Sequence, residues 1–296
     1  MERIDKVLAH QGYGTRKDVK KLLRTSCVTL NGKQIFDPAT HIDLNVDTLA
    51  IDGEKISLQH DLYLMMNKCA DVVCANRDGE HRTVFDLIAP ELRHPFMGGE
   101  LHHVGRLDID TEGLLILTTD GALTHRMISP KTHIPKTYAV RLRDAVDEKT
   151  RAEYTKKFAA GLHIPHEGNE PEFDAQSAEL TWISDSTISA PQDKAAPQKT
   201  TARGAQDIGT TDADTARGAQ ETASVTMQNA AGCDCLLTIY EGKFHQVKRM
   251  FAAVGNEVVY LKRVAMGALQ LDPSLALGTY RELTAEELEL LSSDGR

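Results

Sequence analysis

The chain has 296 residues, more than the roughly 100 to 200 residues of one typical domain, so its length predicts at least two domains. With 41% hydrophobic and 26% charged residues, its composition is that of a globular protein and excludes a wholly disordered or fibrous chain. Its net charge of −9 is unfavourable for a nucleic-acid binder, because such proteins gain affinity by neutralising phosphates.

Membrane insertion, redox chemistry and metal binding are also disfavoured. No apolar run approaches the roughly 18 residues of a membrane-spanning helix, and the N-terminus alternates charged and apolar residues, unlike a signal peptide. The five cysteines form no Cys-x-x-Cys pair, which argues against a disulfide framework and a zinc site. We therefore expect a soluble, cytoplasmic protein with no membrane partner and no metal.

The N-terminal segment reverses the charge balance of the chain. Residues 1–33 hold eight basic groups against three acidic ones. Thr15 and Asp18 form a capping-box pattern that predicts a helix beginning at about Arg16. One face of this helix is basic and carries Arg16, Lys17, Lys20, Lys21 and Arg24. The opposite face carries Val19, Leu22 and Leu23, so the basic face is either an RNA-binding surface or an ordinary solvated one.

Two hairpin signals follow this helix. Strand-like runs at 28–30 and 49–51 precede the tight-turn pairs Asn31-Gly32 and Asp52-Gly53, which predicts a small sheet. The segment resembles the alpha-L RNA-binding motif domain, on the runs Arg3 to Ala9, Thr15-Arg16 and Val28 to Gly32. The resemblance implies an RNA-binding domain over residues 1–58, whose basic helix contacts RNA.

The chain changes character at about residue 60. Strand-like runs at 63–66, 114–118 and 138–142, with a helix over 122–128, predict a mixed second domain whose first part spans 60–183. Residues 184–231 contain only four large apolar side chains and repeat the run Thr-Ala-Arg-Gly-Ala-Gln, which predicts a disordered low-complexity insertion. The runs 180–183 and 236–240 on either side predict neighbouring strands, so residues 232–292 would complete the domain.

Polar residues are concentrated between Gly105 and Leu114, just before an apolar run. An Asp near an Arg is held ionised, which makes it chemically useful where water is excluded. The simpler alternative is a polar turn in which Asp110 and Thr111 satisfy backbone donors. An aspartyl phosphatase is a further alternative for Asp108-Ile109-Asp110, but Glu112 stands where that motif needs Thr.

Four blocks of the chain resemble the RsuA-type branch of the rRNA pseudouridine synthases. They are Leu64 to Lys68, Gly105 to Leu114, Ser129-Pro130 with Lys136-Thr137-Tyr138, and Glu241 to Phe251 running on to Val254-Gly255-Asn256. The resemblance covers nearly the whole chain except 184–231. It implies an α+β fold in which an N-terminal alpha-L motif RNA-binding domain precedes a pseudouridine synthase catalytic domain with a mainly antiparallel sheet. It also implies an isomerase without a cofactor, since the reaction involves no redox change or group transfer.

The resemblance assigns roles to individual residues. It makes Asp108 the essential carboxylate, Tyr138 the ring that stacks on the target uracil, and Lys248 the cation paired with Asp108. Arg106 would enter the RNA stack, and His245 and Arg249 would contact RNA. Judged from the residues alone, Tyr138 could be a core aromatic and Lys248-Arg249 a surface basic pair. Whether Asp108 attacks C1′, attacks C6 or assists elimination to a glycal is left open.

The target RNA is a finer question within this branch. The run His245 to Phe251 resembles the small-subunit enzymes more closely than the Arg-Gln-Ile/Val-Arg-Arg pattern of large-subunit relatives. The resemblance therefore implies 16S rRNA, in a partly assembled small subunit, as the substrate of a monomeric enzyme. Large-subunit 23S rRNA is the alternative substrate, and a non-catalytic rRNA-binding assembly protein is the alternative function.

Overall fold

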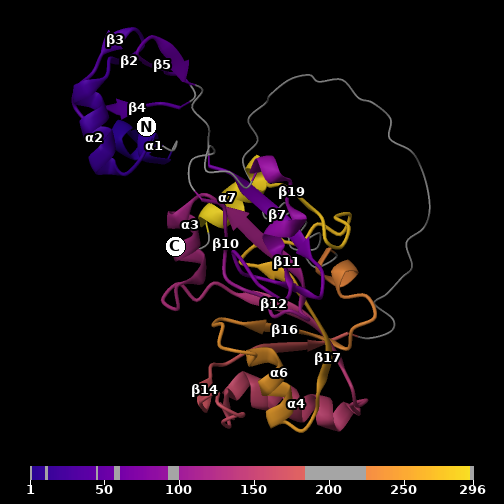
Figure 1. The fold of residues 1–296 in the computed structure, drawn as a ribbon. Helices are drawn as coiled ribbons and strands as arrows, with labels where there is room; N and C mark the ends of the chain where they lie inside the picture. Colours follow the sequence, from indigo (N-terminus) through magenta and orange to yellow (C-terminus); the bar gives the residue numbers. More distant parts are fainter. Residues whose placement is uncertain are drawn as a thin grey trace, which may run out of the picture. The chain divides into compact units, whose positions relative to one another are not determined.

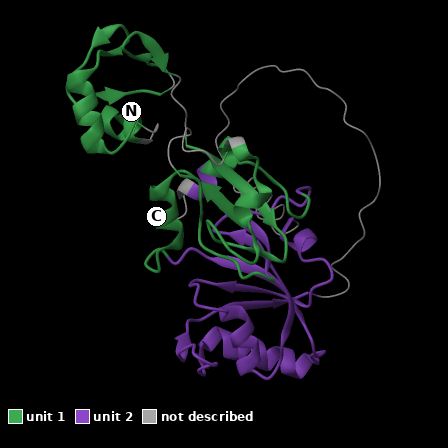
Figure 2. Cartoon of the chain, in the orientation of Figure 1, with its two compact units in different colours: residues 1–110, 115–132, 276–288 green, residues 111–114, 133–275, 289–296 purple. Residues whose placement is uncertain are grey.

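Figure 1 shows the computed structural model of the chain, which describes residues 2–10, 13–44, 46–56, 61–92, 100–183 and 225–293. The chain forms two compact units (Figure 2). Unit 1 comprises 1–110, 115–132 and 276–288, and unit 2 comprises 111–114, 133–275 and 289–296. None of the helices within the described residues is both long and apolar enough to cross a membrane.

The first elements of unit 1 are two helices and short strands. In chain order they are β1 (Glu2–Arg3), α1 (Ile4–His10), α2 (Arg16–Thr25), β2 (Val28–Leu30), β3 (Lys33–Gln34), β4 (His41–Ile42), β5 (Leu49–Ile51) and β6 (Glu54–Ile56). Strands β3, β2, β5 and β6 form an antiparallel sheet in that order. Both predicted hairpin turns are confirmed, because Asn31-Gly32 and Asp52-Gly53 have positive φ angles.

Helix α2 begins where the capping pattern predicted. The Asp18 carboxylate accepts a hydrogen bond from the Thr15 backbone N–H at 2.9 Å, and the Thr15 hydroxyl accepts one from the Asp18 N–H at 3.3 Å. The Thr15 hydroxyl also donates to the Asp18 carboxylate at 2.6 Å, and this bond, followed by the one from the Thr15 N–H, lowers the pKa of Asp18 by favouring its charged form. The predicted capping box is confirmed, and it satisfies two backbone donors that the first turn leaves without helical partners.

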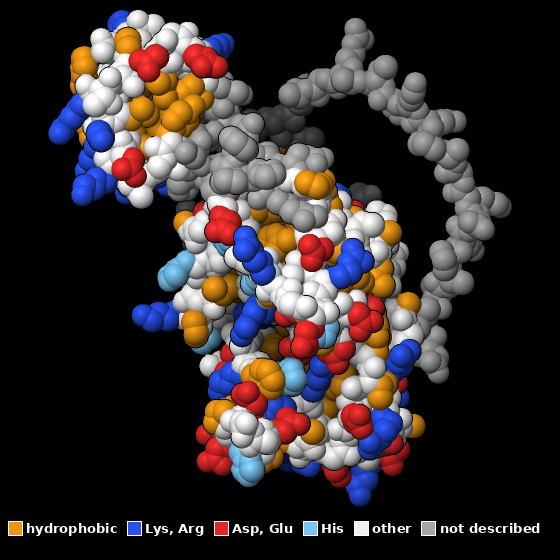
Figure 3. Space-filling view, in the orientation of Figure 1, with side chains coloured by type: hydrophobic (Ala, Val, Ile, Leu, Met, Phe, Trp, Pro, Cys, Tyr) orange, Lys and Arg blue, Asp and Glu red, His pale blue; other side chains and the backbone are white. Residues whose placement is uncertain are grey.

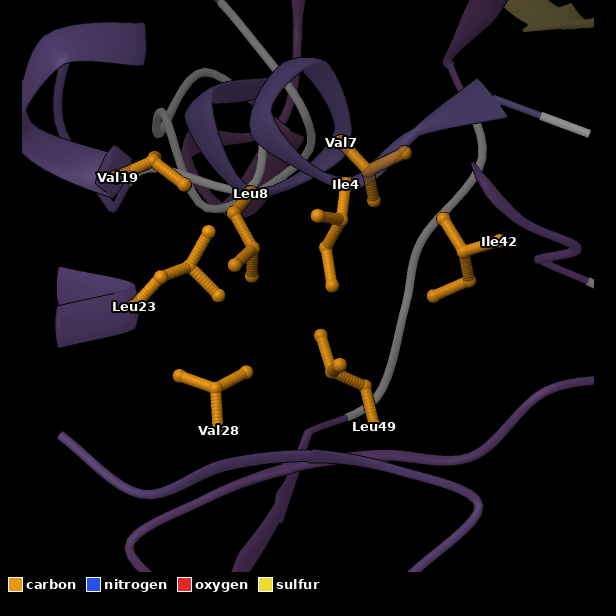
Figure 4. Close-up of a cluster of buried hydrophobic side chains, with 8 residues drawn as sticks. All are labelled: Ile4, Val7, Leu8, Val19, Leu23, Val28, Ile42 and Leu49. Atoms are coloured by element: carbon orange, nitrogen blue, oxygen red, sulfur yellow. The ribbon is translucent and has the colours of Figure 1, made fainter. Parts of the chain in front are cut away.

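A hydrophobic core holds this segment together. Figure 4 shows eight side chains directed toward a common centre: Ile4, Val7, Leu8, Val19, Leu23, Val28, Ile42 and Leu49. All are buried, and each fully buried aliphatic side chain contributes about 1.5 to 3 kcal/mol to folding. The core and the partly buried residues packed against it come from residues 4–56 alone, which is consistent with the predicted N-terminal domain.

The remaining strands form mainly a nine-stranded sheet in the order β15-β16-β12-β17-β11-β7-β19, with β10 added to β11 and β18 to β17. They are β7 (Tyr63–Lys68), β10 (His102–His103), β11 (Glu112–Thr118), β12 (Lys136–Leu142), β15 (Glu179–Trp182), β16 (Cys235–Ile239), β17 (Val258–Met266), β18 (Leu269–Gln270) and β19 (Tyr280–Glu282). Of the strand pairs in this sheet whose register is described, only β11 with β17 is parallel, and the others are antiparallel. The predicted α+β fold with a mainly antiparallel sheet is confirmed.

Smaller elements accompany this sheet. They are β8 (Val72–Val73), β9 (Arg82–Thr83), the 3-10 helices η1 (Val84–Leu87) and η2 (Pro90–Leu92), α3 (Gly121–Ile128), α4 (Glu148–Ala160), β13 (Leu162–Ile164), β14 (Phe173–Ala175), α6 (Gln246–Ala253) and α7 (Ala285–Ser293). In unit 2, Phe158 of α4 and Phe251 of α6 pack with ring centroids 5.0 Å apart. The Trp182 indole N–H donates to the Thr155 hydroxyl at 3.1 Å, which ties β15 to α4. Helix α6 is thereby fixed against a buried aromatic cluster.

The predicted disordered insertion over 184–231 is wrong at its C-terminal end, whereas the prediction of neighbouring strands on either side of it is confirmed. Strands β15 and β16 on either side are antiparallel neighbours, with Leu180 opposite Leu237, as the sequence predicted. However, residues 225–229 are helical, and both Asn229 and Ala230 are buried. The Asn229 amide donates to the Leu271 carbonyl at 2.7 Å. Composition averaged over 184–231 missed this packing because two of its four large apolar side chains, Val225 and Met227, lie in this short stretch, and Met227 packs against the cluster that contains Ala230. Residues 184–224 lie outside the described residues.

The buried amide of Asn229 generates the first testable prediction. Asn229→Ala leaves the Leu271 carbonyl without this donor, so we expect the free energy of unfolding to fall by about 1 to 3 kcal/mol in urea denaturation. The matched control is Gln228→Ala at an exposed neighbouring position, which should change it by less than about 0.5 kcal/mol. Equal stability of the two variants would mean that the bond from Asn229 to the Leu271 carbonyl contributes nothing to the fold.

Candidate active site

The polar motif identified from the sequence forms the loop between β10 and β11. The part of this loop up to Asp110 belongs to unit 1. Asp108 is half-buried in it, Leu107 is buried and Arg106 is exposed. The backbone N–H of Asp71 donates to the Ile109 carbonyl at 2.9 Å, and the Leu107 N–H approaches the Cys74 sulfur at 3.4 Å. The loop is therefore tied at its middle to the chain that follows β7.

Lys68, the last residue of β7, holds the same loop from inside the protein. Its side chain is fully buried, and its ammonium group donates to the carbonyls of Cys69 at 3.0 Å, Asp108 at 3.1 Å and Ile109 at 3.2 Å. Burial lowers the pKa of Lys68, and this effect outweighs that of the nearby Cys74, Cys69 and the two loop aspartates. Two of the three acceptors belong to the loop, so the backbone of Asp108 itself is anchored.

Sequence reasoning assigned no role to Lys68. A sequence signal exists, because Asn67 and Lys68 directly follow the apolar run from Tyr63 to Met66, which has the pattern of a buried strand. Charged residues are almost never fully buried unless they are paired. A lysine on such a strand therefore indicates a specific set of acceptors, but not which residues supply them.

The histidines that precede the loop also make contacts within the protein. One ring nitrogen of His103 lies 2.9 Å from the Gly105 carbonyl, and one of His102 lies 2.8 Å from the Thr124 hydroxyl. Burial lowers the pKa of His103, chiefly by penalising its charged form. No group of three or more His, Cys, Asp and Glu within the described ranges is arranged to hold a metal ion.

In unit 2, the end of the motif touches β17. A Cβ atom added to Gly113, whose φ is 98°, would lie 2.2 Å from the Arg263 carbonyl oxygen. Only glycine allows this approach, in which Gly113 and Arg263 are partners in the parallel β11–β17 pair. The buried Arg263 guanidinium donates from Nε to the Leu114 carbonyl at 2.8 Å. The close packing of β11 against β17 therefore explains why the motif has a glycine at position 113.

Tyr138 lies on β12, a strand with neighbours on both sides. Only 8% of the residue is exposed, and its register partners are Leu237 on β16 and Arg263 on β17. The β12–β17 register shifts between Thr137 and Tyr138, and such irregularities re-aim a side chain. Two residues earlier, burial and the charge of Arg263 lower the pKa of Lys136 to about 8.

Helix α6 carries the last predicted residues. His245 is its N-cap and has a left-handed backbone, and Lys248 is half-buried in the first turn. Arg249 is 5% exposed, and its guanidinium donates to the carbonyls of Pro165 at 2.7 Å and Pro171 at 2.8 Å. These bonds indicate that Arg249 holds the 165–171 loop in place. They do not favour the RNA contact that the resemblance implied for Arg249.

The site residues divide between the two units. Asp108 and Arg106 belong to unit 1 with Lys68, whereas Tyr138, Lys248, His245 and Arg249 belong to unit 2. Contacts inside each unit anchor the Asp108 loop and the Tyr138 strand separately. The pairing of Lys248 with Asp108 stays a prediction.

The predicted basic face of α2 is exposed. Arg16, Lys17, Lys20, Lys21 and Arg24 are all exposed, while Val19 and Leu23 are buried. In Figure 3, Lys and Arg side chains lie on the surface where Figure 1 labels α2. This arrangement concentrates positive charge on one exposed face in a chain whose overall charge is negative.

Comparisons with known proteins match this fold and these motifs. The family model for RNA pseudouridylate synthase matches residues 62–253. An uncharacterised RNA pseudouridine synthase of Bacillus subtilis, YtzG, is 38% identical, with 98% of each chain covered. The ribosomal small subunit pseudouridine synthase A of Vibrio vulnificus is 34% identical over 97% of this chain and 98% of its own. A crystal structure of a pseudouridylate synthase covers 98% of this chain and 100% of its own, with 32% identity and a TM-score of 0.55. With nearly the whole chain matched in sequence and in fold, the protein belongs to the RNA pseudouridine synthase family of isomerases.

Proposed function

We propose that the protein isomerises a uridine of 16S ribosomal RNA to pseudouridine, as a cytoplasmic monomer acting on a partly assembled small subunit. The observation that carries the choice of RNA is the nearly full-length similarity to proteins named ribosomal small subunit pseudouridine synthase A. The run from His245 to Phe251 supports the same choice, since it resembles that branch more than its large-subunit relatives. Large-subunit 23S rRNA is the alternative that an experiment must exclude.

The reaction sets the chemical requirements of the site. The N1–C1′ bond of the uridine breaks, the base turns, and C5 joins C1′ while the C5 proton leaves and N1 gains a proton. Asp108 is proposed as the reactive carboxylate. Attack at C1′, attack at C6 and assisted elimination to a glycal all need it ionised at the same place. Its half-buried position and anchored backbone support this role, because a reacting group must be held in a defined geometry.

The target base must leave its stack before it can react. Extrusion costs a few kcal/mol, which the protein can offset by stacking and by filling the gap. Arg106 is proposed to fill that gap, because it is exposed on the same loop as Asp108. The ring of Tyr138 is proposed to stack on the detached uracil, and Lys248 to keep Asp108 ionised by its opposite charge.

The N-terminal segment is proposed as the RNA-binding domain, with residues 1–58 as its bounds. Its exposed basic helix face supports this role, as does its separate core. Residues 60–183 and 232–292 are proposed as the catalytic domain, extended by 225–231, which belong to unit 2 and pack within it.

The proposed reaction is tested by incubating the purified protein separately with unmodified 16S and 23S rRNA and mapping pseudouridine by chemical labelling. We expect product only in 16S rRNA. Asp108→Asn should abolish product while RNA affinity changes by less than about threefold, since the shape of the side chain is kept. The matched control is Asp71→Asn at an exposed position whose backbone, and not its side chain, holds the loop. Product confined to 23S rRNA would contradict the subunit, and turnover by Asp108→Asn would contradict its role.

Lys68 should act by positioning Asp108. Lys68→Met removes three hydrogen bonds, two of them to the loop, so we expect kcat to fall about 10- to 100-fold. KM should change by less than about threefold, since Lys68 is buried away from RNA. Activity is measured where circular dichroism shows the variant fully folded. A rise in KM with unchanged kcat would show that Lys68 serves RNA binding instead.

The basic face of α2 should set the salt dependence of RNA binding. Reversing Lys20 and Lys21 to Glu should weaken rRNA binding and reduce the slope of log K against log salt by about 2, as the loss of two phosphate contacts does. The matched control reverses Lys156 and Lys157, an exposed pair on α4, with the same change in net charge. Equal slopes for the two double variants would mean that the α2 face is only solvated.

A further inference from the structure

The loop before α6 exposes an aromatic ring. Phe244 is 49% exposed, whereas Phe251 in the same helix region is buried. The Phe244 ring is stacked on the His245 imidazole, with ring centroids 3.7 Å apart and ring planes at 21° to each other. Since one face of the ring lies against His245, the opposite face is the one on which a flat ligand could stack. Phe244 is the single large apolar side chain exposed among residues 241–253, all of which are described.

A hydrogen-bonded network makes this loop rigid. The Gln246 amide donates to the Glu241 carboxylate at 2.7 Å and accepts from the Lys243 N–H at 3.0 Å. The same carboxylate accepts from the Gln176 N–H at 3.0 Å, and the Lys243 ammonium donates to the Asp174 carbonyl at 3.0 Å. These bonds fix the loop to α6 and to the hairpin of β13 and β14. A ring held in this way loses little conformational entropy when a partner binds.

The backbone at His245 supports the same interpretation. Its φ of 48° and ψ of 28° place a non-glycine residue in the left-handed region. Such residues cost free energy and persist where the surrounding structure holds them, most often at functional sites. Here the residue with the left-handed backbone, His245, is the one whose imidazole stacks on the exposed Phe244 ring.

We propose that the Phe244–His245 pair is a stacking platform for an unpaired nucleobase of the substrate RNA, other than the target uridine. This inference rests on the proposed action on rRNA. Every nucleobase presents a flat face, and stacking on exposed aromatic rings is the general way in which proteins bind single-stranded RNA.

A nucleobase fits this surface better than a protein partner does. A stable protein interface buries about 800 Å² on each side around a core of several apolar residues. One exposed ring between charged and polar neighbours offers far less apolar area than that. It does match the single ring face that one base covers.

The test compares ring and non-ring side chains at position 244 in the full-length protein, with the rRNA fragment on which it forms pseudouridine. Phe244→Leu keeps the apolar bulk and removes the flat ring, and Phe244→Tyr keeps the ring. Loss of one stacked base weakens binding about 5- to 150-fold, so we expect Phe244→Leu to raise the Kd at least about fivefold. Phe244→Tyr should stay within about twofold of wild type, and kcat at saturating RNA should be unchanged in both. The matched control is Val259→Ala, at a residue exposed to 48% in the same unit.

A fluorescent base locates the contact. With 2-aminopurine placed in turn at the unpaired positions around the target, we expect quenching at one of them by wild type and Phe244→Tyr, and none by Phe244→Leu. Equal Kd values for wild type and Phe244→Leu, with no quenching at any position, would overturn the platform while leaving the isomerisation intact. A wild-type protein that forms no pseudouridine in either rRNA would instead refute the proposed function. Sedimentation of Phe244→Leu as a smaller species than wild type would show that a second copy covers the ring, which also overturns the proposal.

Discussion

The geometry around Asp108 depends on one buried ammonium group. An ion inside a protein loses its hydration, so it is tolerated only where fixed dipoles replace the water. Around Lys68 three backbone carbonyls do so, and two of them belong to the Asp108 loop. Moving that loop would leave a buried charge without these acceptors, which is costly. The conformation of the loop is therefore coupled to the folding of β7, which fixes the backbone that carries the Asp108 carboxylate.

A second set of polar contacts organises the surface around α6. Glu241 and Arg249 are directed into the protein, where they bind backbone groups of the segment around β13 and β14. Gln246 supports them by donating to the Glu241 carboxylate and accepting from the Lys243 N–H. The residues between and beyond them, Phe244, His245 and Lys248, are exposed or half-buried. The motif from Glu241 to Arg249 thus alternates residues that bind other parts of the protein with residues whose side chains are accessible to a ligand. This division explains why Arg249 and Lys248, adjacent in sequence, have different environments.

The negative net charge of the protein does not oppose RNA binding, because the basic residues are not evenly distributed. Five of them are exposed on α2, opposite the buried Val19 and Leu23. Electrostatic attraction to phosphates falls off over about 8 Å at physiological salt, so local charge matters more than the total. Some acidic residues serve the fold: Asp18 completes the capping box of α2, and Asp120 caps α3.

The sequence by itself determined the features that local chemistry controls. The capping box of α2, the Asn-Gly and Asp-Gly turns, the helix after Asp120 and the strands at 63–66, 114–118 and 138–142 were all predictable, because each depends on residues close together in the chain. The family motifs likewise identified the isomerase. Tertiary structure alone decided the roles of Lys68, Gly113, Asn229 and Arg249. Each of these acts on a partner between 40 and 150 positions away in the sequence, and no local pattern specifies which distant carbonyl or strand will lie beside it.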